Sequence, residues 1–390
     1  MRLALWSPRP KGGWVAALVP HLASECALTL VDAEPASPPE TDLDVFDIAD
    51  DPAHGWVHRA LRARPGLVVL DAWSLHRLVH AETAGRGDAA AYLREARRAH
   101  GETGTFVARQ VLKGLGGELL PALFPLNDRV LEESLGLVAA TEYVRRRAAA
   151  RVPGRPVLHL PLHLEGLVPL PMRAAARAAL GLAVEGPVVA ALQPAAALPE
   201  RTHRALKRLG AQVIWTTDDD PRRAECLAAA DVLVALEHPP RGRVPGTVAS
   251  AVAAGRPTLV SAGSAAAAEF PAGVVVPVSP GPTEDAEVEA LGRRLLADAS
   301  LRTRVGDLAS AYVRQRTDPA RATGALVALA REVVAGKEAA LRAIAADRAA
   351  EGTLQAWAME EVRWGARELS LSEAGLGLDR LLGELFRGAS

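Results

Sequence analysis

Cysteine is scarce in this sequence. Its 390 residues include only Cys26 and Cys226, which stand far apart among apolar neighbours, so we expect two buried free thiols in a reducing compartment rather than a disulfide. The sequence also lacks a cysteine-based metal spacing, a P-loop and the Ser-His-Asp order of a hydrolase. These absences argue against zinc ribbons, P-loop nucleotidases and serine hydrolases, and we expect no metal site.

Lysine is also rare, and positive charge is not in excess. Only four of the 45 basic residues are lysines, and the net charge is -1. A chain without a global positive field is not expected to bind nucleic acid. No uninterrupted apolar run approaches the length of a membrane span, and the apolar start at residues 2–6 is too short for a signal peptide. The sequence predicts a cytoplasmic protein, at most peripheral to a membrane.

What the sequence does contain is a regular alternation of apolar runs and helical patterns. With 49% hydrophobic and 23% charged residues over 390 positions, two domains are expected. Apolar runs that do not alternate are typical of parallel strands covered on both faces. Such strands are predicted at residues 3–6, 27–31, 67–70, 137–140, 157–160, 188–192, 213–216, 231–236, 258–261 and 274–278. Residues 35–44 are interpreted as a proline-rich acidic loop. The pattern predicts doubly wound α/β domains at 1–165 and 166–335, followed by a helical extension at 336–390.

One stretch, residues 230–263, organises the second domain. It predicts a buried strand, a Pro/Gly loop, a helix of small residues, Gly255 as the end of that helix with a proline just beyond, and a second strand. The helix follows Gly246 directly, so the free N–H groups of Gly246, Thr247 and Val248 point above the strand ends. A helix start above a parallel sheet is a ready anion site.

This unit resembles the donor-binding unit of retaining, nucleotide-sugar-dependent glycosyltransferases with the GT-B fold (glycosyltransferase group 1, family 4-like). The matching residues are Ala230-Asp231-Val232, Gly246, Ala253-Ala254-Gly255-Arg256-Pro257 and Ser261-Ala262-Gly263. The resemblance implies two Rossmann-like, doubly wound domains that face a cleft, with a C-terminal helical segment crossing back onto the first domain.

The polar positions of the unit depart from the family's pattern. In the family a Glu stands three residues before the helix glycine, and many members carry a second Glu seven residues further on; here Arg243 and Ser250 occupy those places. Carboxylates there accept hydrogen bonds from ribose and sugar hydroxyls, whereas Arg243 has the reverse charge and Ser250 is short and neutral. We expect the loop to contact the donor through backbone N–H groups and through Arg241 or Arg243, with a plain turn as the alternative. Gln193 stands where active relatives bring a basic residue to the diphosphate.

The first domain offers a weaker set of candidates. Asp71 and His76 follow a short central strand, where open parallel sheets place ligands, in a segment that resembles a Leu-His-Asp-x-x-Leu-His-His-Leu stretch of the same family. We expect them to form a polar pair that orients the substrate, with packing at the cleft edge as the alternative for His76. Gly12 and Gly13 would let a backbone approach the donor or acceptor closely, although a tight turn needs no ligand.

Two functions remain open on the sequence. The first is transfer of a sugar from a nucleotide-diphosphate sugar to a glycan, lipid-linked or protein acceptor. The resemblance implies that this reaction is metal-independent, needs no cofactor besides the donor and retains the anomeric configuration. The second is a catalytically degenerate pseudo-glycosyltransferase that acts as a scaffold or as the partner subunit of another protein. A nucleotide-sugar epimerase on the same fold comes third, because it would need more acidic and basic residues in the cleft than the sequence places there.

Overall fold

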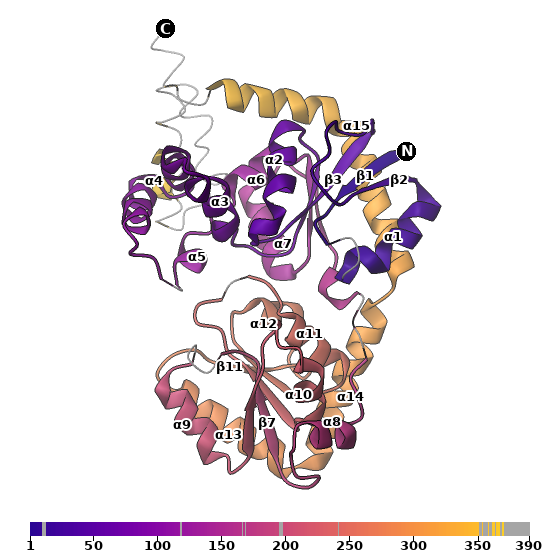
Figure 1. Ribbon diagram of the computed structural model, residues 1–390, viewed down its shortest axis with the longest axis vertical. Helices are drawn as coiled ribbons and strands as arrows, with labels where there is room; N and C mark the ends of the chain where they lie inside the picture. The colour runs from indigo at the N-terminus through magenta and orange to yellow at the C-terminus, as the bar shows by residue number, and fades with distance from the viewer. Residues whose placement is uncertain are drawn as a thin grey trace.

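The computed structural model shows two α/β domains, the first drawn above the second in Figure 1. The described residues are 1–9, 13–117, 119–165, 167, 169–194, 198–240 and 242–350, with 353, 358, 361, 362, 364–366 and 369 beyond them. Within these ranges no helix is both long enough and apolar enough to cross a membrane.

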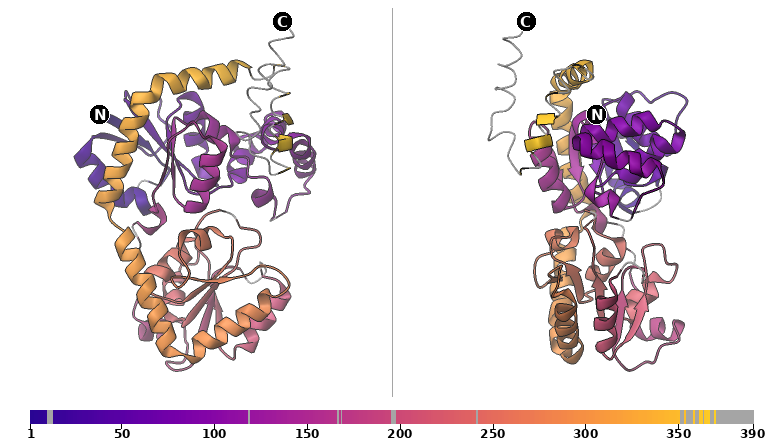
Figure 2. Two further views of the ribbon diagram at one scale, coloured as in Figure 1. Left: turned by 180° about the vertical axis from the view of Figure 1, so that it is seen from behind. Right: turned by 90° about the vertical axis from the view of Figure 1, so that its left-hand side faces the viewer.

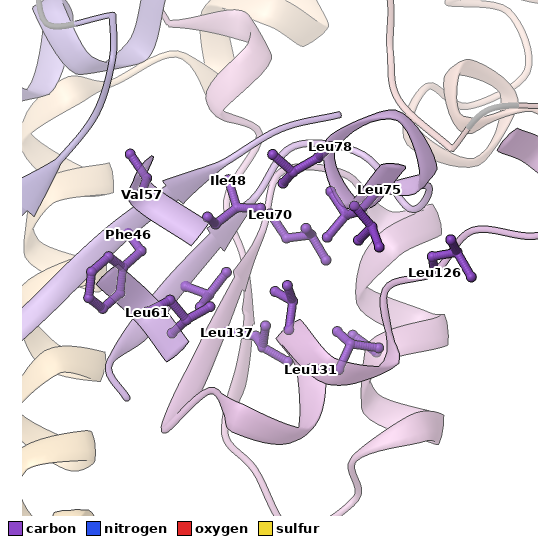
Figure 3. Close-up of a cluster of buried hydrophobic side chains, with 14 of the residues drawn as sticks. Phe46, Ile48, Val57, Leu61, Leu70, Leu75, Leu78, Leu126, Leu131 and Leu137 are labelled. Atoms are coloured by element: carbon purple, nitrogen blue, oxygen red, sulfur yellow. The ribbon is translucent and has the colours of Figure 1, made fainter. Parts of the chain in front are cut away.

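The sheet of the first domain has six parallel strands in the order β2-β1-β3-β4-β5-β6. They are β1 (Arg2–Trp6), β2 (Ala27–Val31), β3 (Leu43–Ile48), β4 (Leu67–Leu70), β5 (Gly136–Ala139) and β6 (Val157–His159). The helical segments are α1 (Gly13–Glu25), η1 (Pro52–His54), α2 (Gly55–Ala63), α3 (His76–Glu82), η2 (Ala84–Arg86), α4 (Ala89–Leu112), α5 (Leu120–Leu123), α6 (Asp128–Glu133), α7 (Glu142–Arg151) and η3 (Leu162–Leu164). Both faces of this sheet are buried by apolar clusters. Figure 3 shows one of them, in which Phe46, Leu70 and Leu137 from the strands meet Leu61 and Leu78 from the helices.

Strand β3 was not predicted from the sequence. The sequence pattern indicated a loop over residues 35–44 and no strand between residues 31 and 67. Two aspartates, Asp44 and Asp47, interrupt its apolar run, yet both are buried. Each is paired: Asp44 accepts a hydrogen bond from Trp6 Nε1 at 3.1 Å, and Asp47 accepts one from Ser7 Oγ at 2.8 Å. Buried polar groups with partners are tolerated in a sheet, and these partners lie about forty residues away, where no local pattern shows them.

The sheet of the second domain has five parallel strands in the order β11-β10-β9-β7-β8. They are β7 (Val188–Ala191), β8 (Gln212–Trp215), β9 (Val232–Ala235), β10 (Thr258–Ser261) and β11 (Val276–Val278). The helices are α8 (Arg173–Ala179), α9 (Glu200–Arg208), α10 (Arg223–Ala229), α11 (Gly246–Ala253), α12 (Ala265–Glu269), α13 (Glu284–Ala297) and α14 (Ala299–Arg316). Both sheets change winding direction beside their first strand, between β1 and β3 and between β7 and β9. In doubly wound sheets ligands bind at the carboxyl ends of strands flanking such a switch point.

A single helix, α15 (Pro319–Ala350), crosses from the second domain back onto the first. It packs against α1 and β5, and Figure 2 shows it running along the back of the first domain. Its Leu326, Ala330 and Val333 belong to a core cluster of the first sheet. The approach is close, since a Cβ at Gly136 on β5 would lie 2.7 Å from Val333 Cγ2. The expected crossing helix is confirmed, and the expected boundary at residue 335 falls inside it.

Candidate functional site

The N-terminus of α11 holds an anion, and that anion is a carboxylate of the chain itself. Asp218 follows β8 and accepts hydrogen bonds from the backbone N–H groups of Gly246 at 3.2 Å and Thr247 at 2.8 Å. The same carboxylate forms an ion pair with Arg243 in the loop before α11. Because a helix N-terminus carries unsatisfied N–H groups and partial positive charge, Asp218 occupies the place predicted for a donor phosphate.

Sequence reasoning missed Asp218, although a signal was present. Asp218 is the first of three consecutive aspartates, which begin three residues after the end of β8. Because the carboxyl ends of parallel strands share one edge of the sheet, an acidic turn after β8 lies near the start of the helix that follows β9. Pairing the two would have needed the strand order, which the sequence does not state.

Arg243 is the cation on which the acidic groups of this region act. Its side chain is 43% exposed and lies among acidic groups from both domains. Burial by itself disfavours the charged guanidinium, but the carboxylates of Asp71, Asp218 and Glu237 outweigh that effect and raise its pKa. Asp71 follows β4 in the first domain, so the structure brings the predicted residues Asp71 and Arg243 into one electrostatic cluster across the domain interface.

The loop that carries Arg243 is in contact with the first domain. Gly242 has φ +76°, and a Cβ at this position would lie 2.5 Å from Trp73 Cβ and 2.9 Å from Tyr143 Cε1. Only glycine combines this left-handed conformation with so close an approach. We call this arrangement, with the β9–α11 loop seated on Trp73 and Tyr143, the closed arrangement.

Comparisons with known proteins bear on the fold. No protein-family model and no curated protein matches the chain. Among solved structures, sucrose-phosphate synthase from Thermosynechococcus elongatus is 14% identical with a TM-score of 0.55, over 86% of this chain and 100% of that chain. The structure of Anabaena HepE in complex with UDP and glucose is 13% identical with a TM-score of 0.46, over 87% and 100%. The chain has the GT-B glycosyltransferase fold. At such low identity the likeness establishes the GT-B fold, and the activity must be argued from the site.

Gln193 lies at the switch point of the second GT-B domain, but its amide is engaged by backbone. Its Nε2 donates to the Leu236 carbonyl at 2.7 Å, and its Oε1 accepts from the Leu236 N–H at 2.9 Å. These bonds continue the pairing of β7 with β9 beyond the strand ends. The side chain thus extends the pairing of two strands at the position where the family resemblance places a basic residue of active relatives.

His76 is held inside the first GT-B domain and is not paired with Asp71. Its Nδ1–H donates to the Phe124 carbonyl at 2.6 Å, and its Nε2 accepts from the Tyr92 hydroxyl at 2.8 Å. The Phe124 carbonyl can only accept a hydrogen bond, so the proton of the neutral ring is assigned to Nδ1. Burial lowers the pKa of His76, so the ring is neutral near pH 7. Both ring nitrogens are hydrogen-bonded within the first domain, which favours the interpretation that His76 is a packing residue.

The remaining predicted residues are distributed along the site and away from it. Thr247 is buried in the first turn of α11, and its Oγ1 is without a partner among the described residues. Ser250 is half-buried one turn further along α11. Gly13 begins α1 with φ +54°, and no described atom lies within 4 Å of a Cβ added there. Gly12 and Arg241 lie outside the described residues.

A separate cavity of about 460 Å³ lies beside the end of β6. Its wall comes from the β6–η3 segment and from the junction of α14 with α15, and includes His159, Glu165, Arg316 and Arg321. No group of three or more His, Cys, Asp or Glu side chains in the described part of the chain is arranged to hold a metal ion.

Proposed function

We propose that this chain is a nucleotide-sugar-dependent glycosyltransferase whose donor site is built around Arg243 and the N-terminus of α11. The observation that carries the proposal is the anion already held there: two backbone N–H groups and a guanidinium bind the carboxylate of Asp218. A phosphate of the donor makes the same kind of contacts. The donor phosphate then displaces the carboxylate of Asp218 from these groups. Displacement is feasible because the Asp218 side chain is 28% exposed.

The neighbouring carboxylates supply what the two replaced family positions lack. The charges of Asp71 and Glu237 both act on Arg243, and in this proposal their carboxylates accept hydrogen bonds from ribose or sugar hydroxyls. Arg243 and the N–H groups of Gly246 and Thr247 would stabilise the negative charge of the leaving diphosphate without a metal. The reaction proposed is transfer of the sugar, with retention of configuration, to a hydroxyl of a glycan, a lipid-linked molecule or a protein.

A second candidate is the degenerate pseudo-glycosyltransferase, a scaffold or partner subunit. One observation favours it: three carboxylates surround the single guanidinium of Arg243, and like charge disfavours a diphosphate. The amide of Gln193 adds no compensating positive charge.

Calorimetric titration with UDP, GDP and their hexose conjugates separates the two candidates. The donor-site proposal predicts binding with a preference for one nucleotide and a matching rise in melting temperature. Replacing Arg243→Gln should weaken that binding by about tenfold or more, because a charge-assisted contact is lost. Arg314→Gln, an exposed change on α14, serves as the control and should bind like the wild type. Absence of binding by every nucleotide in the wild type would leave the degenerate scaffold as the function.

A further inference from the structure

A fully buried carboxylate, that of Glu269, also lies at the domain interface. Glu269 ends α12 in the second domain, and its side chain is 0% exposed. It accepts a hydrogen bond from the backbone N–H of Glu142 at 2.9 Å, and one of its oxygens lies 3.0 Å from Nε2 of His159. Both partners belong to the first domain, so the contact exists only while the domains touch.

The partner of Glu269 is the start of a helix. Glu142 is the first residue of α7, whose N-cap Thr141 accepts from the Val144 N–H at 3.2 Å. Glu269 therefore adds a second acceptor and a full negative charge at the positive end of the α7 dipole. The two helices pack against each other, and Tyr143 of α7 packs against the apolar core of the second domain.

Groups from both domains surround Glu269. Tyr312 on α14 donates its hydroxyl to the Glu269 backbone carbonyl at 2.8 Å, and Phe270 of the second domain packs edge-on against His163. The charged and titratable groups that face Glu269 from the first domain are His159 on β6, His163 on η3, Asp71 acting on His163, and Glu142 with its partners Arg145 and Arg146.

We propose that Glu269 is a latch that holds the two domains in the closed arrangement through Glu142 and His159, and that acid releases it. Opening the domains must break both contacts and return the carboxylate to water. In the closed arrangement two polar atoms of this cluster, Glu269 Oε1 and His163 Nε2, are buried without a hydrogen-bond partner among the described residues. When the domains open, water can reach both atoms. Their solvation offsets part of the cost of breaking the Glu269 contacts, which makes the latch reversible.

The direction of the pH effect follows from the two shifted groups. Burial lowers the pKa of His163, a shift that the charge of Glu269 only partly opposes. Burial alone would raise the pKa of Glu269, but the His159 hydrogen bond and the histidine charges lower it below its usual value. A group with a lowered pKa in the closed form binds its proton better in the open form. Closure is therefore favoured above the ordinary pKa of each group and is weakened as the pH falls, from about pH 6.5 downward for His163 and only from about pH 4.5 downward for Glu269.

Small-angle scattering of the full chain measures the opening, and hydrogen exchange over residues 141–145 measures the cap. The wild type should be compact at about pH 7.5 and larger in radius of gyration at about pH 5.5, on either side of the histidine range. Glu269→Ala should already be larger at the higher pH and respond less to acid. Its exchange over residues 141–145 should rise by about tenfold, since a charge-assisted hydrogen bond is lost.

Two further variants make the outcome decisive. Glu269→Gln keeps an acceptor for the Glu142 N–H, so it should restore most of the protection at residues 141–145. It also removes the charge that raises the pKa of His163 in the closed arrangement, so its opening between about pH 7.5 and about pH 5.5 should be larger than that of the wild type. Glu200→Gln, an exposed change on α9, should behave as the wild type. If Glu269→Ala raises exchange at residues 141–145 with an unchanged radius of gyration at both pH values, Glu269 is a helix cap and not a latch. A wild-type radius that does not respond to pH overturns the release by acid.

Discussion

Two helices begin at the domain interface with a carboxylate on their first N–H groups, and the two carboxylates differ in origin. α11 receives Asp218 from its own domain, whereas α7 receives Glu269 from the other domain. The Asp218 side chain is 28% exposed and paired with a guanidinium, while that of Glu269 is 0% exposed and lies beside an imidazole. A solute can replace Asp218 without domain movement, but Glu269 leaves only when the domains separate. Under the two proposals, the same local chemistry serves ligand exchange at one helix and domain closure at the other.

The largest expected effect comes from breaking the closed arrangement at a third point, Gly242. An alanine there would place its Cβ 2.5 Å from Trp73 Cβ, and overpacking of this kind costs about 1–3 kcal/mol. Gly242→Ala should expose the α7 start to hydrogen exchange while the Asp218 contacts to α11, which lie within one domain, keep their protection.

Gly263→Ala is the matched control for that variant. Gly263 has φ +81°, close to the φ of Gly242, but no atom lies within 4 Å of an added Cβ. Both variants pay the left-handed backbone cost of about 1–2 kcal/mol, and only Gly242→Ala pushes against the first domain. Equal exchange at the α7 start in the two variants would show that the Gly242 contact does not hold the domains together.

A smaller effect is expected from the other acceptor at α7. Thr141→Ala removes the side-chain cap on Val144 and should lower the free energy of unfolding by about 1 kcal/mol, measured by urea denaturation. Thr303→Ala, at an exposed position within α14, removes a hydroxyl that caps no helix and should cost less. Because Thr141 and Glu269 act on the same helical turn, their double variant should deviate from additivity. Strict additivity would mean that the two acceptors act independently.

The sequence was enough for most of the fold and for little of the site. Continuous apolar runs identified every strand of the described residues except β3, because these signals are local. The partners of the site are not local. Asp218 meets α11 from 28 residues away and Glu269 meets Glu142 from 127 residues away, and no spacing rule links such positions. His76 was given a substrate role for the same reason, since its partners Tyr92 and Phe124 come from distant segments.

The most direct test of the account is the affinity of Asp218→Asn for a nucleoside diphosphate, compared with the wild type and with Asp219→Asn in one calorimetric series. Asp219 is exposed in the same turn, so it controls for the change in charge. If Asp218 occupies the phosphate position, Asp218→Asn should bind about tenfold more tightly than the wild type, because a competing charged acceptor is weakened, and Asp219→Asn should bind as the wild type does. Equal affinity in all three proteins would contradict the assignment of the α11 N-terminus as the donor site.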